Sequence, residues 1–137
     1  MTVAASIRKM KEVAPTELST ALAAVLKVVD WGTPGVEADN KRAVALQVKD
    51  LNGTNVSEAV ILRLTSSGTS TMALVAAGAG TVLEGTGTDD MIIQTSATGL
   101  FNLEVADALT ETVTVLAGPT GGSPLIDCSE SVDLAFA

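Results

Sequence analysis

The sequence contains no histidine and no tyrosine, and it has a single cysteine among its 137 residues. Without histidine the chain cannot form a Ser-His-Asp triad, a Cys-His pair or an imidazole metal site. One cysteine, Cys128, excludes an internal disulfide and a cysteine zinc site, and no neighbouring base activates its thiol. We therefore expect a protein that is not an enzyme, with no catalytic residues and no cofactor.

Aromatic side chains are almost as scarce, since the chain holds only Trp31, Phe101 and Phe136. Glycoside hydrolysis uses paired carboxylates, but the sugar also needs aromatic platforms, so this composition argues against a glycosidase. As the only tryptophan, Trp31 is a possible interface anchor. The alternative is that Trp31 caps one end of a hydrophobic core.

Acidic residues form two groups that could ligate calcium through oxygen. One is the pair Asp89-Asp90, and the other comprises Asp127, Glu130 and Asp133. Neither group has the spacing of a known calcium loop. We interpret both as solvated charges that keep the surface soluble and discourage strand addition, and we expect no metal site.

Basic residues are few and unevenly placed. The formal net charge is −8, which argues against nucleic acid as a partner because phosphate binding needs clustered lysine and arginine. Residues 1–29 nevertheless carry four basic and two acidic side chains, whereas the remainder carries four basic and fourteen acidic ones. This contrast indicates a basic arm that docks on an acidic surface. A solvated amphipathic segment is the alternative interpretation.

Long hydrophobic runs are also missing. No window approaches the roughly 18 consecutive apolar residues of a transmembrane helix. Glu12, Pro15 and Glu17 interrupt the apolar core that a signal peptide requires. We therefore expect no membrane partner and no signal peptide.

Residues 1–22 are interpreted as an N-terminal arm that precedes a domain over residues 23–137. Pro15 and Glu17 are typical of a helix start, so the arm is expected to be mobile or helical. Its apolar and basic side chains are predicted to attach the chain to an assembly. These assembly residues are Ile7, Arg8, Lys9, Met10, Lys11, Leu18 and Leu22.

The domain has the pattern of an all-β protein. Apolar residues alternate with polar ones in short segments, and Gly-, Ser- and Thr-rich spacers separate them at 66–70, 85–88 and 118–123. Strands are predicted over 25–31, 43–50, 60–65, 72–76, 82–84, 91–95, 100–105, 112–116 and 132–136. This rhythm favours an antiparallel β-sandwich or a closed barrel. Positions 44, 46, 48, 60, 62, 64, 132, 134 and 136 are expected to face inward.

Two segments resemble a known family. In the first, a strand ends at Asp50, a turn carries Gly53, Val56 follows, and Ala59-Val60 opens the next strand. The second runs from Thr95 to Val105 and includes Gly99. Together they resemble bacterial immunoglobulin-like modules of the invasin/intimin type, and especially those of tailed-phage virion proteins. Ser96 stands where this family usually has an acidic residue.

The resemblance covers residues 43–137 and implies an immunoglobulin-like antiparallel β-sandwich without catalytic residues. It further implies a structural virion protein that is made in the host cytoplasm and decorates the phage head as a capsid cement protein or forms a short fibre. Its partners would then be other virion proteins and further copies of itself, and the N-terminal arm would anchor it. The alternatives are a tail-associated structural protein and an adhesin or carbohydrate-binding module.

Overall fold

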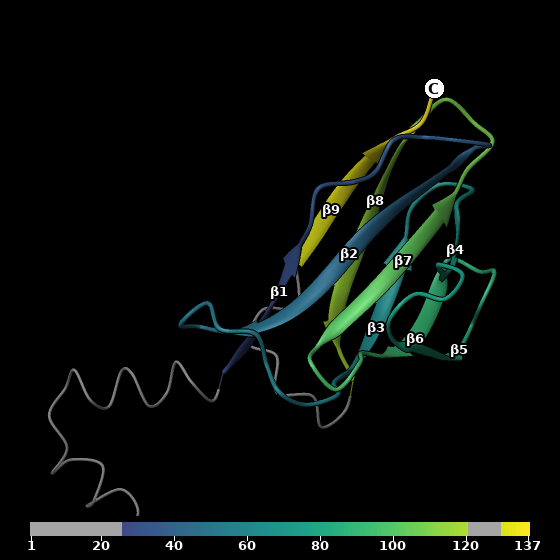
Figure 1. Cartoon of the computed structure of the whole chain (residues 1–137). Coiled ribbons are helices and arrows are strands. Elements are labelled where there is room, and N and C mark those ends of the chain that lie inside the picture. Colours follow the sequence, from purple (N-terminus) through teal and green to yellow (C-terminus); the bar gives the residue numbers. More distant parts are fainter. Residues whose placement is uncertain (1–25, 121–129) are drawn as a thin grey trace, which may run out of the picture.

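The structure, a computed structural model, describes residues 26–120 and 130–137. These two ranges form nine β-strands and no helix (Figure 1). The strands are β1 (Lys27–Trp31), β2 (Lys41–Asp50), β3 (Ile61–Ser66), β4 (Thr71–Leu74), β5 (Thr81–Glu84), β6 (Asp90–Gln94), β7 (Leu100–Ala106), β8 (Thr112–Pro119) and β9 (Glu130–Ala135).

The strands form two antiparallel sheets that pack face to face (Figure 1). One sheet has the order β1-β2-β7-β4, and the other has the order β5-β6-β3-β8-β9. With β5 and β6 set aside, these are the two sheets of an immunoglobulin constant-type sandwich. The β5–β6 hairpin is inserted between β4 and β7 and extends the second sheet beyond β3. The prediction of an all-β, immunoglobulin-like sandwich is confirmed.

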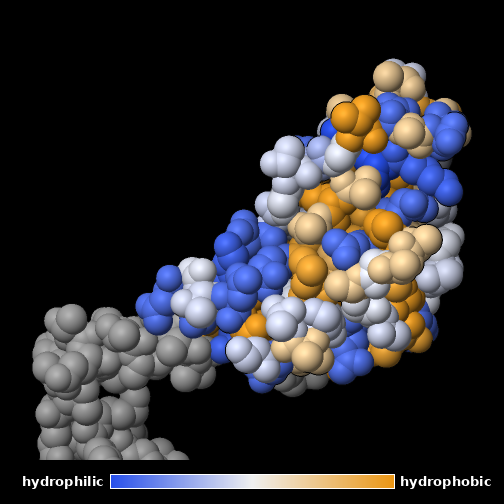
Figure 2. Space-filling model, viewed as in Figure 1, coloured by the Kyte–Doolittle hydropathy of each residue, from blue (hydrophilic) through white to orange (hydrophobic). Residues whose placement is uncertain are grey.

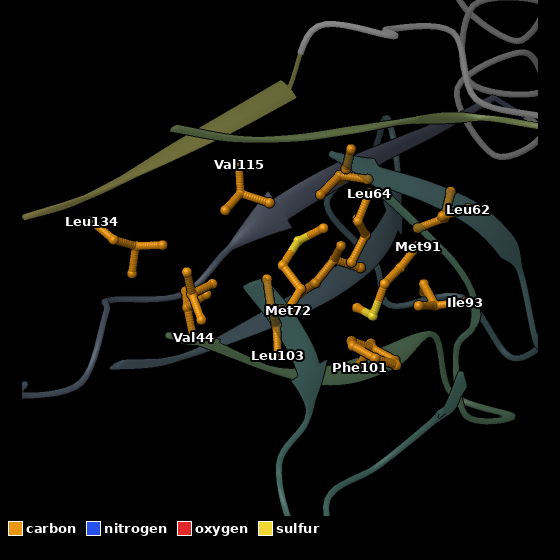
Figure 3. Close-up of a cluster of buried hydrophobic side chains, with 14 of the residues drawn as sticks. Val44, Leu62, Leu64, Met72, Met91, Ile93, Phe101, Leu103, Val115 and Leu134 are labelled. Atoms are coloured by element: carbon orange, nitrogen blue, oxygen red, sulfur yellow. The ribbon is translucent and has the colours of Figure 1, made fainter. Parts of the chain in front are cut away.

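The core lies between the inner faces of the two sheets and follows the predicted alternation. Eight of the nine expected positions are buried, and the ninth, Val132, is partly buried against the same cluster. Figure 3 shows Leu62 and Leu64 of β3 together with Phe101 and Leu103 of β7. Fully burying one aliphatic side chain contributes about 1.5–3 kcal/mol, so this cluster is the main source of stability.

The ends of the strands differ from the prediction by up to three residues, and two of these differences have a visible cause. The strand β4 stops at Leu74 instead of reaching Ala76, because Gly78 N–H bonds the Val75 carbonyl and Ala77 has a φ of 57°. The strand β8 continues to Pro119, although residues 118–123 were expected to form a loop. Its partner β3 extends far enough to pair Leu62 with Pro119. A local turn thus ends β4, whereas at the end of β8 long-range pairing outweighs the local turn signal.

A side-chain cap organises the loop after β2. The Asp50 Oδ1 atom accepts hydrogen bonds from the backbone N–H groups of Asn52 (2.9 Å) and Thr54 (3.0 Å). Gly53 lies between them with a φ of 81°, which glycine adopts without strain. The loop then returns to the domain through Val56, which is 7% exposed.

Ser96 plays the same part in the turn before β7. Its Oγ atom accepts hydrogen bonds from the N–H groups of Thr98 (3.3 Å) and Leu100 (3.2 Å). A serine hydroxyl caps such a turn as an aspartate would, but more weakly. Val48 N–H donates to the Gly99 carbonyl (2.8 Å), and a Cβ on Gly99 would collide with Val56. The two segments that carry the family resemblance therefore pack together at one end of the sandwich.

We predict that Val48→Asp destabilises the domain by several kcal/mol, because Val48 is fully buried and the new carboxylate would have no partner. Val36→Asp is the matched control, since Val36 is 92% exposed. Chemical denaturation should separate the two variants clearly. Equal stability of the two would contradict the assignment of the core.

Ser96→Ala should lower the free energy of unfolding by about 1 kcal/mol, because two backbone N–H groups lose their acceptor. Ser96→Asp should retain the wild-type stability, since a carboxylate accepts the same bonds. Ser57→Ala, at an exposed loop position, serves as the control. If urea denaturation gives equal midpoints for the two alanine variants, the cap has no energetic role.

Candidate interaction surface

Most of the residues predicted to attach the chain lie outside the described residues. This applies to Ile7, Arg8, Lys9, Met10, Lys11, Leu18 and Leu22, and equally to Asp127 and Cys128. The described chain starts at residue 26. Lys27 pairs with Asp50 at the end of the sandwich that holds the loop after β2, which we call the Asp50 loop. The C-terminus lies at the opposite end (Figure 1).

Trp31 lies at the end of β1 and is partly buried against the core. It pairs with Leu46, which is fully buried, so both side chains lie on the inner face of the sheet. The indole Nε1 is buried and has no hydrogen-bond partner among the described residues. Trp31 thus packs against the core from the edge strand β1.

The acidic residues that the sequence groups together have separate environments. Asp90 forms a bidentate ion pair with Arg63, with contacts of 2.9 Å and 2.6 Å. This hydrogen bonding lowers the pKa of the Asp90 carboxyl, partial desolvation opposes the shift, and the Arg63 charge adds to it. Asp89 is exposed, and Asp133 accepts a hydrogen bond from the Thr114 hydroxyl (2.7 Å).

Large apolar side chains project from the outer face of the five-stranded sheet. Ile61 on β3 and Leu116 on β8 are 41% and 43% exposed, and Leu83 on the edge strand β5 is 49% exposed. Alternation along each strand places them outward, because their neighbours Leu62 and Val115 face the core. We call this surface the β3 face and define it by Ile61, Arg63, Thr65, Asp90, Ile92, Leu116 and Gly118.

Two shallow hollows lie on the β3 face, one on each side of Arg63. One has a volume of about 410 Å³, and the other of about 440 Å³. The first is lined by Arg63, Glu84, Gly85, Thr88, Asp90 and Ile92, and the second by Arg63, Thr65, Leu116, Gly118 and Pro119. Arginine is enriched at protein–protein contacts. The β3 face can therefore offer both apolar area and charge to another protein surface.

The outer face of the four-stranded sheet differs in character. Figure 2 shows this face, where hydrophobic side chains gather over β2 and β7 between polar ones. Its hollow is smaller, at about 240 Å³, and is lined mainly by small residues such as Gly35, Ala43 and Ala45. The β3 face carries the larger apolar side chains and is the better candidate for a contact.

The sequence did not single out the β3 face. One residue of this face was indicated by the pattern, because the apolar Ile61 lies between Val60 and Leu62, which were predicted to face inward. The Arg63–Asp90 pair gave no signal, because these residues are 27 positions apart. Within residues 26–120 and 130–137, no three His, Cys, Asp or Glu side chains are placed to hold a metal ion. The same ranges contain no helix long and apolar enough to cross a membrane.

Comparisons with known proteins identify no family. No protein-family model matches the sequence, and no curated protein matches it. Among solved structures, the fold is similar to the solution NMR structure of a conjugate transposon protein from Bacteroides vulgatus. The two chains are 13% identical with a TM-score of 0.41, over 82% of this chain and 84% of that chain. At this level the similarity carries nothing about function.

Proposed function

We propose that this chain is a non-enzymatic structural protein of a phage virion. It decorates the head or forms a short fibre, and it acts as a homo-oligomer that residues 1–22 anchor to other virion proteins. The observation that carries the proposal is the β3 face, where large apolar side chains surround an ion pair on the outside of a closed sandwich. Such a surface serves contacts between proteins.

The β3 face suits a contact between two copies of the chain. It carries both a cation, Arg63, and an anion, Asp90, with apolar side chains on either side. A two-fold contact needs a surface that is complementary to itself, and a surface with both charges meets this requirement. Several copies would then multiply weak anchoring contacts through effective concentration.

The position where β1 starts supports anchoring at one end of the body. β1 follows the arm in sequence and starts at the end of the sandwich that holds the Asp50 loop. The C-terminus lies at the other end (Figure 1). An arm attached to a virion surface would therefore direct the C-terminal end of the sandwich away from that surface.

Leu116→Asp is predicted to abolish self-association, because it places a charge in the apolar part of the β3 face. Leu51→Asp is the matched control, since Leu51 is 46% exposed but lies in the loop after β2. Sedimentation velocity should show the wild type and Leu51→Asp as oligomers and Leu116→Asp as a monomer. An oligomeric Leu116→Asp would place the self-contact elsewhere.

Deletion of residues 1–22 is predicted to leave a folded domain that no longer joins its assembly. The apolar side chains of the arm should supply most of the affinity, at roughly 25 cal/mol per Å² before ordering costs. High salt should weaken attachment only in part, because it screens charge and spares apolar contacts. Full-length and truncated protein should be mixed with undecorated particles and sedimented.

A triple variant with alanine at Arg8, Lys9 and Lys11 separates charge from apolar contact in the same assay. It should bind more weakly than the wild type and lose most of the salt dependence. Co-sedimentation of the truncated protein at the wild-type level would contradict anchoring by the arm. Binding of the protein to a glycan array in place of particles would favour the adhesin alternative.

A further inference from the structure

Two carboxylates and a hydroxyl meet at the end of the sandwich that carries the C-terminus. Asp107 directly follows β7, Glu111 directly precedes β8, and Thr69 lies in the loop between β3 and β4. The Thr69 Oγ1 atom lies 3.2 Å from Asp107 Oδ1 and 3.4 Å from Glu111 Oε1. Two loops that are distant in sequence thus bring three oxygen-bearing side chains together.

Asp107 is buried, with 4% of its surface exposed. Its Oδ1 atom accepts hydrogen bonds from the Leu109 N–H (2.8 Å) and from the Thr69 hydroxyl. Its Oδ2 atom is buried as well and has no hydrogen-bond partner among the described residues. Burial of a carboxylate oxygen destabilises the folded state unless a hydrogen-bond donor, a proton or a cation contacts that oxygen.

Donors are too few for the acceptors in this cluster. The Thr69 hydroxyl has one proton for two carboxylates, and the Thr69 N–H donates to Glu111 Oε1 at 3.2 Å. The ion pairs between described residues engage Asp30, Asp90 and Glu104 instead. Among the described residues, no lysine or arginine forms an ion pair with Asp107 or Glu111.

The backbone beneath the cluster is shaped for the Glu111 carboxylate. Gly68 has a φ of 67°, and a Cβ at this position would collide with the carboxylate of Glu111. The loop can therefore receive this carboxylate only with glycine at position 68. The Phe136 N–H donates to the Glu111 carbonyl (2.8 Å) and ties the cluster to the C-terminal segment.

We propose that Asp107, Glu111 and Thr69 form a calcium site. Calcium takes six to eight oxygen ligands at about 2.3–2.6 Å, which places neighbouring oxygens roughly 3.3–3.7 Å apart at right angles. Magnesium, at about 2.0–2.1 Å, would need oxygens roughly 2.8–3.0 Å apart. The Thr69 hydrogen bonds of 3.2 Å and 3.4 Å hold the three oxygens at spacings compatible with calcium ligands. Water fills the remaining positions, so the affinity is weak, with a Kd of about 10⁻⁴–10⁻³ M.

Thermal unfolding of the full chain at neutral pH tests the site. Calcium chloride at about 10 mM should raise Tm by several degrees over EDTA, since a ligand of the folded state stabilises it. Magnesium chloride at the same concentration should have a smaller effect. An unchanged Tm in calcium would overturn the proposal and leave a shared proton as the reason for the close carboxyl groups.

Variants place the effect at this cluster. Glu111→Gln and Asp107→Asn should each lose the calcium shift, whereas Asp89→Asn, an exposed acidic position outside the cluster, should keep it. If Asp107→Asn does not fold, Glu111→Gln decides, because Glu111 is only partly buried. In NMR spectra of the wild type, calcium should move the amide signals of Thr69 and Leu109. A calcium shift of Tm that persists in Glu111→Gln would also overturn the proposal.

Discussion

Contact between the inner faces of the two sheets determines the rest of this structure. Leu62 and Leu64 of β3 belong to the same buried cluster as Phe101 and Leu103 of β7, and these strands belong to different sheets, so the cluster joins the two layers. Because side chains alternate along a strand, burial of Leu62 and Leu64 forces Ile61 and Arg63 outward. A slip of one residue would bury Arg63 and expose the leucines. The β3 face is therefore a consequence of the same register that builds the core.

The sequence predicted those parts of the fold that depend on alternation within one strand. Val44, Leu46 and Val48 could be placed inward because each apolar residue is followed by one that tolerates water. Features that depend on a distant partner could not be read in this way. The local pattern identifies β4 as a strand, but only the folded chain shows that it pairs with β7 and that the β5–β6 hairpin extends the sheet of β3. The continuation of β8 to Pro119 has the same origin, since β3 supplies the pairing.

Sites built from charged residues were harder to predict than the core. Asp89 and Asp90 are adjacent in sequence, yet only Asp90 pairs with Arg63, which lies on the neighbouring strand. Asp107 and Thr69 are 38 positions apart, and their contact exists only because β7 and the loop after β3 end at the same level of the sandwich. Composition gives the number of such groups, whereas topology decides which of them meet. The arm at residues 1–22 differs from both cases, because its predicted role rests on composition and stays a prediction.

The proposed anchoring by the arm and the proposed self-contact through the β3 face would constrain each other. Two copies that meet through this face can be related by a two-fold axis that runs either along the strands or across them. An axis across the strands would place the starts of the two β1 strands at opposite ends of the pair. An axis along the strands would place both at the same end, beside the Asp50 loops. The axis could run between the neighbouring strands β3 and β6. Arg63 of each copy would then lie over β6 of the other copy, the strand that carries Asp90 and Ile92. This arrangement would bring Arg63 of each copy towards Asp90 of the other, and it would turn both Asp107 clusters away from the end where β1 starts.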